Sequence, residues 1–295
     1  MQPPQLHTLS ATTNMADRGI EWTGGAAGLY IAQRLELLEV LSGCETKNKY
    51  NIVQIPGGTD IPIAPAGDFN TQWREQSKAV PLLKAKEQSE CFERICCPLF
   101  RSFTMEFKDA TDNVFFKIQR PFKCDPCYAP PVFTCTQQEL TIMDKNGTIV
   151  ATAKEKGGCC NGCCTRQFVI TGPDGKLMYE MNAPECGYKS GAGGCNLCAP
   201  SCCKEAYVID VYDENHQIVN EASSAFVFPG CNCAGLTDRS NFVVNFPADA
   251  PVEKRMGLLA GMMLIEYAVN EKKQQDQKNN SGGGGAPPAA QEMQR

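Results

Sequence analysis

The middle of the chain repeats one pattern of apolar and polar positions. A short run in which apolar residues alternate with polar ones leads into a turn rich in Asp, Asn and Gly, and a second apolar run follows. This order is typical of a β-hairpin. It occurs four times, with paired arms at 103–107 and 114–118, 140–142 and 148–151, 168–170 and 177–181, and 207–211 and 217–219.

Further strands flank these hairpins. Residues 50–55 read as a strand, and the flanking strands bring the expected number to at least nine or ten. Residues 29–40 place Ile31, Leu35 and Leu38 at helical or mixed spacing, which predicts a short amphipathic segment instead. Antiparallel strands in this number must curl or close to hide their edges. The pattern therefore predicts a mainly β protein built as a closed antiparallel barrel.

One segment near the C-terminus is strongly apolar at helical length. Residues 256–265 carry no charge, but crossing about 30 Å of hydrocarbon takes roughly 20 apolar residues, and Glu266 interrupts the run. The length favours a helix buried in protein, with a membrane-inserted segment as the alternative. Gly257 and Gly261 would let a surrounding wall approach this helix. Its apolar positions are Met256, Leu258, Leu259, Met262, Met263, Leu264 and Ile265.

Charge and the chain ends narrow the class of protein. The 295 residues include 28 Lys and Arg against 33 Asp and Glu, a formal charge of −5, which argues against a nucleic-acid partner. Residues 1–19 and 271–295 are polar and without period, so we expect disordered tails around one domain at 20–270. No apolar run at the N-terminus suits a signal peptide, which predicts a reducing compartment with mostly free thiols.

Cysteine is the unusual component. The chain has 18 cysteines, and those of the central region cluster between the predicted hairpins rather than within them. If hairpins alternate in direction, these connections gather at one end of the barrel. Histidine is scarce by contrast, with only His7 in a tail and His216 in a turn. Neither Ser-His-Asp nor Cys-His chemistry then has a base, so we expect no enzyme and no catalytic residues.

Several longer motifs resemble the phospholipid scramblase family. They are LELLEVLSGCETKNKY at 35–50, Cys96-Cys97 just before RSFT at 101–104, QRPFKC at 119–124, and DRSNFVVNFPAD at 238–249 followed by the apolar helix. The motifs occur in the family's order and cover roughly residues 20 to 270. None of them is a short generic pattern.

The resemblance implies a fold and an activity. The fold is the tubby-like barrel, in which about a dozen strands surround a central hydrophobic helix. The activity is ATP-independent, calcium-dependent, bidirectional movement of phospholipids between bilayer leaflets. The partner would be a phospholipid membrane, reached from the cytoplasmic face of the plasma membrane or, alternatively, of a mitochondrial membrane; no protein partner is indicated. A membrane-docked lipid-binding or signalling adaptor that moves no lipid is the alternative function.

The resemblance also implies a calcium site. Calcium takes six to eight oxygen ligands with enough carboxylate to offset its charge. The segment offers two carboxylates and has Ser240 where the family commonly has Asp, so we expect weak binding. Because 242–246 alternates like a half-buried strand, a purely structural role is the alternative. The implied ligands, several through backbone carbonyls, are Asp238, Ser240, Phe242, Val244, Phe246 and Asp249.

The cysteines have three interpretations. Family resemblance implies S-palmitoylation, and stable anchoring needs more than one acyl chain, so dense clusters are the best candidates. Zinc is the rival, because two Cys-x-x-Cys pairs that meet in space form a tetrahedral thiolate site. Small apolar fillers in tight loops are the third possibility. The acylation candidates are Cys124, Cys127, Cys159, Cys160, Cys163, Cys164, Cys202 and Cys203; the zinc candidates are Cys160, Cys163, Cys195 and Cys198.

Overall fold

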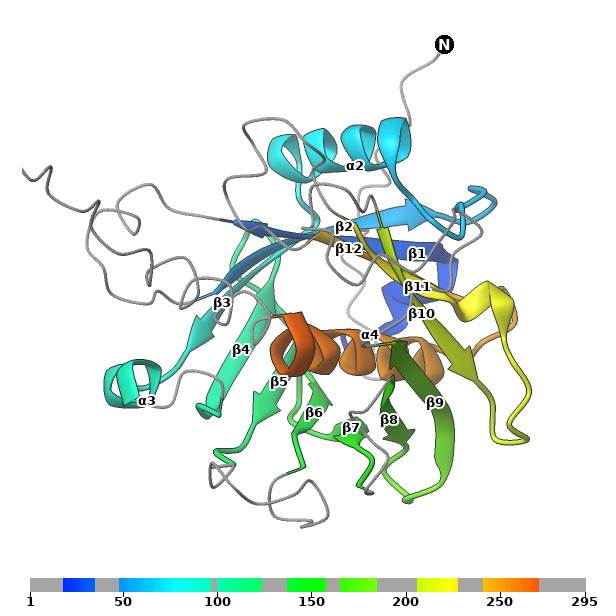
Figure 1. Cartoon of the computed structure of the whole chain (residues 1–295). Coiled ribbons are helices and arrows are strands. Elements are labelled where there is room, and N and C mark those ends of the chain that lie inside the picture. Colours follow the sequence, from blue (N-terminus) through cyan, green and yellow to red (C-terminus); the bar gives the residue numbers. More distant parts are fainter. Residues whose placement is uncertain are drawn as a thin grey trace, which may run out of the picture.

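The computed structural model describes residues 18–34, 48–96, 100–123, 137–157, 165–184, 206–227 and 241–270. Twelve strands in this part of the chain form one closed antiparallel barrel (Figure 1). The strands are β1 (Ala26–Arg34), β2 (Lys49–Pro56), β3 (Leu83–Gln88), β4 (Phe103–Lys108), β5 (Val114–Arg120), β6 (Glu139–Asp144), β7 (Ile149–Glu155), β8 (Thr165–Thr171), β9 (Leu177–Pro184), β10 (Ala206–Tyr212), β11 (Ser224–Val227) and β12 (Asn241–Asn245).

Every strand pairs with its neighbours in sequence, and β1 pairs with β12 to close the barrel. The closing register sets Leu29 opposite Val244 and Ile31 opposite Phe242. Closure leaves no free sheet edge among these strands, so none of them exposes a row of unpaired backbone N–H and C=O groups. The prediction of a closed antiparallel barrel is therefore confirmed.

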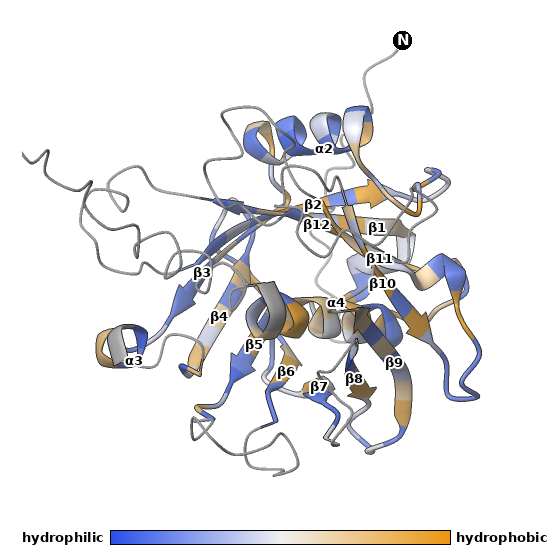
Figure 2. Ribbon diagram, viewed as in Figure 1, coloured by the Kyte–Doolittle hydropathy of each residue, from blue (hydrophilic) through white to orange (hydrophobic). Residues whose placement is uncertain are grey.

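A single long helix fills the barrel. Helix α4 (Val252–Ile265) continues into the short π-helix η5 (Glu266–Asn270), and the strands surround both in Figure 1. All side chains of α4 from Arg255 onward are buried. Figure 2 shows hydrophobic residues along α4, inside the ring of strands, and both hydrophobic and hydrophilic residues along most of the strands. A helix without a polar face is stable only when it is enclosed, and the barrel encloses this one. The central hydrophobic helix is thus also confirmed.

Smaller helices cover parts of the outside and the ends. Helix α2 (Gly67–Ala79) packs on the outer face of β1 and β2, where Trp73 joins a second apolar cluster with Tyr30 and Val53. Helix α3 (Cys91–Cys96) lies between β3 and β4 in the chain. The 3-10 helices are η1 (Glu21–Gly25), which precedes β1, and η3 (Asn220–Ala222), which precedes β11.

The first three predicted hairpins are β4–β5, β6–β7 and β8–β9. The second arm of the fourth predicted hairpin, at 217–219, was placed wrongly. Residues 217–219 contribute only one isolated bridge, from Ile218 to Tyr212, and the strand that pairs with β10 is β11. All four residues of β11 are buried, so its sequence lacks the alternation by which the other arms were found.

The prediction of a short amphipathic segment at 29–40 was also wrong over residues 29–34, the part that the structure describes. Residues up to Arg34 belong to β1, because Leu29 and Ile31 face the barrel core while Tyr30 lies under α2. A strand buried on both faces shows no period of two. The strand predicted at 50–55 is β2. The predicted tails lie outside the described residues, apart from Arg18 and Gly19; Arg18 forms an ion pair with Glu253 of α4.

Candidate functional site

The strand order brings the cysteine-bearing segments to one end of the barrel. Because consecutive strands are antiparallel, the connections β1–β2, β3–β4, β5–β6, β7–β8, β9–β10 and β11–β12 all leave and re-enter the barrel at the same end. All 18 cysteines fall in these six connections and none in a strand or in α4. We call this end of the barrel the thiol end, and the opposite end the hairpin end. The topology thus agrees with the expected gathering of the cysteine clusters.

Few of the cysteines themselves belong to the described residues. Cys91 is exposed at the start of α3, and Cys96 ends that helix. The predicted acylation and zinc residues, all between 124 and 203, lie outside the described residues. Within the described ranges, no group of three or more His, Cys, Asp or Glu residues is arranged to hold a metal ion.

The segment predicted to bind calcium is largely a strand. Asp238 and Ser240 lie outside the described residues, while Phe242 and Val244 lie in β12 and Phe246 follows it. These three side chains point into the barrel core. At about 3.3 Å per residue, 242–246 spans about 13 Å, which exceeds the roughly 5 Å across a calcium coordination sphere. Carbonyls spread along this strand do not converge on one ion, so Asp249, exposed in the turn before α4, is the described ligand candidate that remains.

A buried arginine organises the turn that carries Asp249. The guanidinium of Arg255 donates to the carbonyl oxygens of Thr23 (2.6 Å) and Ala26 (2.7 Å) in the N-terminal segment. It also donates to those of Pro247 (3.2 Å), Ala248 (2.9 Å) and Ala250 (2.8 Å) in the turn itself. Burial lowers the pKa of Arg255. Five neutral acceptors satisfy its five donors, so the turn, η1 and the start of α4 are held together.

A cleft of about 760 Å³ opens beside this turn at the hairpin end. Its lining includes the acidic residues Glu221 and Asp249 together with Asn245, Ile61 and Arg255. The side-chain amide of Asn245 donates to the carbonyl of Ser223 (2.6 Å), which fixes its orientation at the edge of β12. Phe246 and Asp249 of the predicted calcium segment line this cleft.

A buried charge pair lies at the thiol end. Glu87 on β3 accepts hydrogen bonds from Nε (2.7 Å) and Nη2 (3.0 Å) of Arg101, and both side chains are at most 4% exposed. Burial alone would raise the pKa of Glu87, but the hydrogen bonds and charge of Arg101 outweigh burial and lower it. The hydroxyl of Tyr267 in η5 is 3.4 Å from the same carboxylate. The pair therefore anchors the end of the central helix to the wall.

Sequence reasoning missed this pair, although a signal for it exists. Along β3, Leu83, Ala85 and Glu87 alternate with exposed residues and share the inner face of the strand. The period of two thus places a carboxylate inside the barrel, where it needs a cationic partner.

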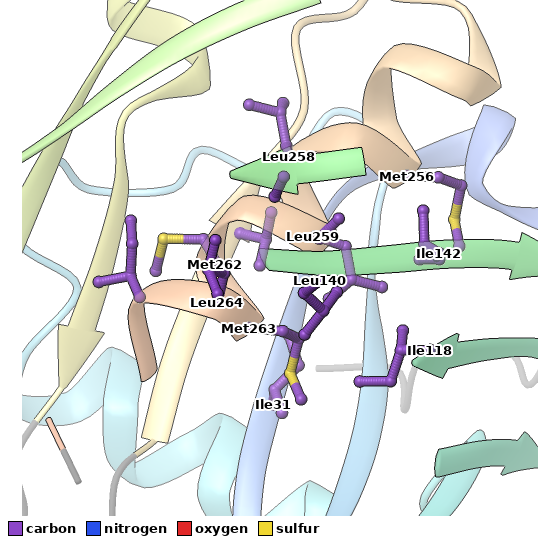
Figure 3. Packing of buried hydrophobic residues seen from close by; sticks show 14 of the residues in the cluster. Ile31, Ile118, Leu140, Ile142, Met256, Leu258, Leu259, Met262, Met263 and Leu264 are labelled. Carbon is purple, nitrogen blue, oxygen red and sulfur yellow. The ribbon is translucent and has the colours of Figure 1, made fainter. Parts of the chain in front are cut away.

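Close packing joins the central helix to the barrel wall. Figure 3 shows its side chains interleaved with Ile31, Ile118, Leu140 and Ile142 of the wall. A Cβ atom at Gly257 would lie 3.0 Å from Cγ2 of Ile170, a contact so tight that Ile170 would have to move by a few tenths of an ångström. In the described part of the chain, no helix combines the length and apolarity that crossing a membrane requires. The seven apolar positions predicted as core or membrane helix are core residues here.

Comparison with known proteins identifies the family of this chain. A family model described as Scramblase matches residues 74–272, from α2 to just beyond η5. The chain belongs to the scramblase family. The match covers more than half of the chain and includes the cysteine-bearing connections from β3 onward, together with the central helix.

Individual relatives extend the similarity toward the N-terminus. Mouse phospholipid scramblase 1 is 25% identical over 257 residues, which cover 86% of this chain and 64% of that protein. Bovine phospholipid scramblase 2 is 26% identical over 250 residues, covering 84% and 70%. Human phospholipid scramblase family member 5 is 30% identical over 138 residues, covering 47% and 41%. The chain spans less than two thirds of the length of the mouse protein. No solved structure matches this chain.

Proposed function

We propose that this scramblase-family chain moves phospholipids between the leaflets of a bilayer in both directions, without ATP and in response to calcium. The observation that carries the proposal is the family match across β3 to η5, which includes ten of the twelve barrel strands and the central helix. The names of the relatives, phospholipid scramblases 1 and 2, support it. No covalent step is part of the proposed activity, so no residue is given a catalytic role.

Transbilayer exchange in liposomes tests the activity. Purified protein is reconstituted into vesicles that carry a labelled lipid, and a membrane-impermeant quencher is added with and without calcium, in the absence of ATP. We expect the protected inner-leaflet label to become accessible faster when calcium and protein are both present. No difference between protein-containing and protein-free vesicles would refute the proposal.

Calcium dependence is proposed to act through the 238–249 segment. The exposed carboxylate of Asp249 in the turn before α4 supports a weak site there, because calcium prefers carboxylate oxygen. Asp249→Ala should shift the calcium dependence of exchange to higher concentration. Glu214→Ala, which removes an exposed acid at the same end of the barrel, is the matched control and should leave the dependence unchanged. Equal responses of Asp249→Ala and Glu214→Ala would remove Asp249 from the site.

We further propose that acyl chains on cysteines of the thiol end hold the protein on the cytoplasmic face of a membrane, either the plasma membrane or a mitochondrial membrane. Six cysteine-bearing connections that share one end of the barrel would let several chains enter one bilayer together. Acyl-exchange labelling with and without hydroxylamine tests this. Labelling that does not depend on hydroxylamine would refute thioester acylation.

Zinc binding by the same cysteines is the competing proposal for the thiol end. Cys160 and Cys163 lie just before β8, and Cys195 and Cys198 lie between β9 and β10. Thr165 at the start of β8 is paired with Pro184 at the end of β9. The β7–β8 connection therefore enters the barrel wall beside the point where the β9–β10 connection leaves it. Stoichiometric zinc in the purified protein would support the metal site, and its absence would favour acylation.

A lipid-binding or signalling adaptor is the second candidate function. It is favoured by the burial of α4, because a helix that fills the barrel is not free to contact lipid. Carbonate extraction before and after hydroxylamine treatment reports whether acyl chains alone retain the protein on the membrane. Vesicle binding without lipid exchange would then establish the adaptor and exclude the scramblase.

A further inference from the structure

The described residues of the thiol end include a group of exposed aromatic and basic side chains. Phe92 on α3 is 75% exposed, and Phe122 after β5 is 44% exposed. Phe92 follows the exposed Cys91 directly. We define the thiol rim as the exposed residues Arg34, Lys86, Cys91, Phe92, Phe122 and Lys154.

No neighbouring acid in the described part of the chain is paired with the basic side chains of the thiol rim. Within the part of the chain that the structure describes, Arg34, Lys86 and Lys154 form no ion pair. They lie at or next to the thiol-end termini of β1, β3 and β7, so they are spread around the barrel rather than confined to one strand. Three unpaired cations at the same end as two exposed aromatic side chains fit a surface that is negative on the outside and apolar beneath.

The hairpin end has the opposite character. Its turns carry Asp109, Asp174 and Asp213, and two of its lysines are paired with acids, Lys176 with Asp174 (3.1 Å) and Lys254 with Glu214 (3.1 Å). Asp109 and Asp213 also accept backbone amides of their own turns. An acidic, internally satisfied surface of this kind is repelled by anionic lipid.

Resting on the proposed function, we infer that the thiol rim is the surface by which the barrel docks on an anionic lipid bilayer, with the hairpin end directed away from it. Phe92 and Phe122 enter the interface, and Arg34, Lys86 and Lys154 lie at the headgroups. Each such cation near an anionic membrane strengthens binding about fivefold. Docking in this orientation would bring the cysteine-bearing connections to the lipid before any acyl chain is attached.

Tryptophan fluorescence tests the orientation. The two native tryptophans, Trp22 and Trp73, lie in η1 and α2 and provide a constant background. The full chain is treated with hydroxylamine to remove thioester-linked groups, then mixed with vesicles of phosphatidylcholine alone or with phosphatidylserine. Phe92→Trp should shift its emission to the blue only on phosphatidylserine vesicles. Ile149→Trp, at a site of the hairpin end that is 46% exposed, should not shift.

Binding measurements provide a second test. Lys86→Gln combined with Lys154→Gln should weaken co-sedimentation with phosphatidylserine vesicles by more than tenfold, and raised salt should weaken the wild type similarly. Lys176→Gln is the matched control and should bind like the wild type. Unchanged binding of the rim variants, or a blue shift at position 149 instead of 92, would overturn the inference.

Lipid scrambling and docking through the thiol rim can be refuted independently of each other. Wild-type protein that binds vesicles through the thiol rim yet moves no lipid refutes scrambling and supports docking. Protein that moves lipid while the tryptophan at position 92 stays in water refutes docking and leaves scrambling intact.

Discussion

Gly261 of α4 lies so close to Met181 of β9 that a Cβ atom at Gly261 would be 2.3 Å from the Met181 sulfur. Two side-chain atoms of Ile170 would lie within 3.3 Å of the same Cβ. The absent side chain thus lets the barrel wall reach the helix backbone, and the Gly-x-x-x-Gly spacing with Gly257 serves packing inside the protein.

We therefore predict that Gly261→Ala lowers the free energy of unfolding by about 1–3 kcal/mol through overpacking. This loss should occur although alanine favours a helix by about 1 kcal/mol over glycine. Urea unfolding measures it. In a Met181→Ala background the cost of Gly261→Ala should shrink, because the clashing sulfur is gone. An equal cost in both backgrounds would mean that the two residues do not touch.

Leu264→Arg places a charge in the barrel core, where Leu264 is fully buried. An unpaired buried cation costs several kcal/mol, so we expect the variant not to fold in detergent-free buffer. Ile63→Arg is the control, because Ile63 is 62% exposed and its substitution should change stability by less than about 0.5 kcal/mol. Circular dichroism and size-exclusion chromatography report the outcome. A folded, monomeric Leu264→Arg protein would contradict the burial of α4.

Arg255 satisfies five carbonyl oxygens from two distant parts of the chain. Arg255→Met leaves these buried acceptors without donors, and we expect a loss of about 3–5 kcal/mol in unfolding free energy. Arg255→Lys should recover only part of it, because an ammonium has three donors and no planar fork. Thermal unfolding of the wild type, Arg255→Lys and Arg255→Met should rank their stabilities in that order. Equal stability of the Met and Lys variants would show that the hydrogen bonds contribute little.

The Glu87–Arg101 pair predicts a specific response to acid. The pKa of Glu87 is lowered in the folded protein, so its contribution to stability is complete above the ordinary value of 4.5 and is lost as the pH falls through the folded pKa. Urea unfolding at pH values from about 5 downward should show this loss in the wild type. Arg101→Met alone should cost about 3–5 kcal/mol at neutral pH, because it leaves a buried carboxylate unpaired.

The double variant Glu87→Leu/Arg101→Met separates the pair from the other carboxylates. Replacing both partners by apolar groups is often close to neutral, so the double variant should be more stable than Arg101→Met. It should also lose less stability on acidification than the wild type does. The same acid dependence in the double variant and the wild type would assign that dependence to other carboxylates.

The sequence was informative for strands that have one polar face and for the helix α4, which is apolar all round. Hairpins β4–β5, β6–β7 and β8–β9 have alternating strands and turns with glycine or aspartate in left-handed conformation, at Asp112, Gly147 and Gly175. The central helix could be predicted because it is apolar all round and too short for a bilayer. Strands β1 and β11 could not, because burial on both faces removes the alternation on which strand prediction depends.

The candidate site was less predictable, because its contacts join segments far apart in the chain. The carbonyls around Arg255 come from both η1 and the β12–α4 turn, and no local pattern pairs them. Phe242 and Val244 were predicted calcium ligands through family resemblance, yet their alternation already indicated the strand β12. The sharing of one barrel end by all cysteine-bearing connections did follow from hairpin order alone.

Hydrogen exchange along α4 tests the central claim, that the helix is the core of a barrel closed before any membrane is present. Backbone amides of Leu258 to Ile265 should be among the slowest to exchange in aqueous buffer without lipid or detergent, and liposomes should not change their rates. Fast exchange of these amides in buffer, followed by protection only when lipid is added, would contradict the account.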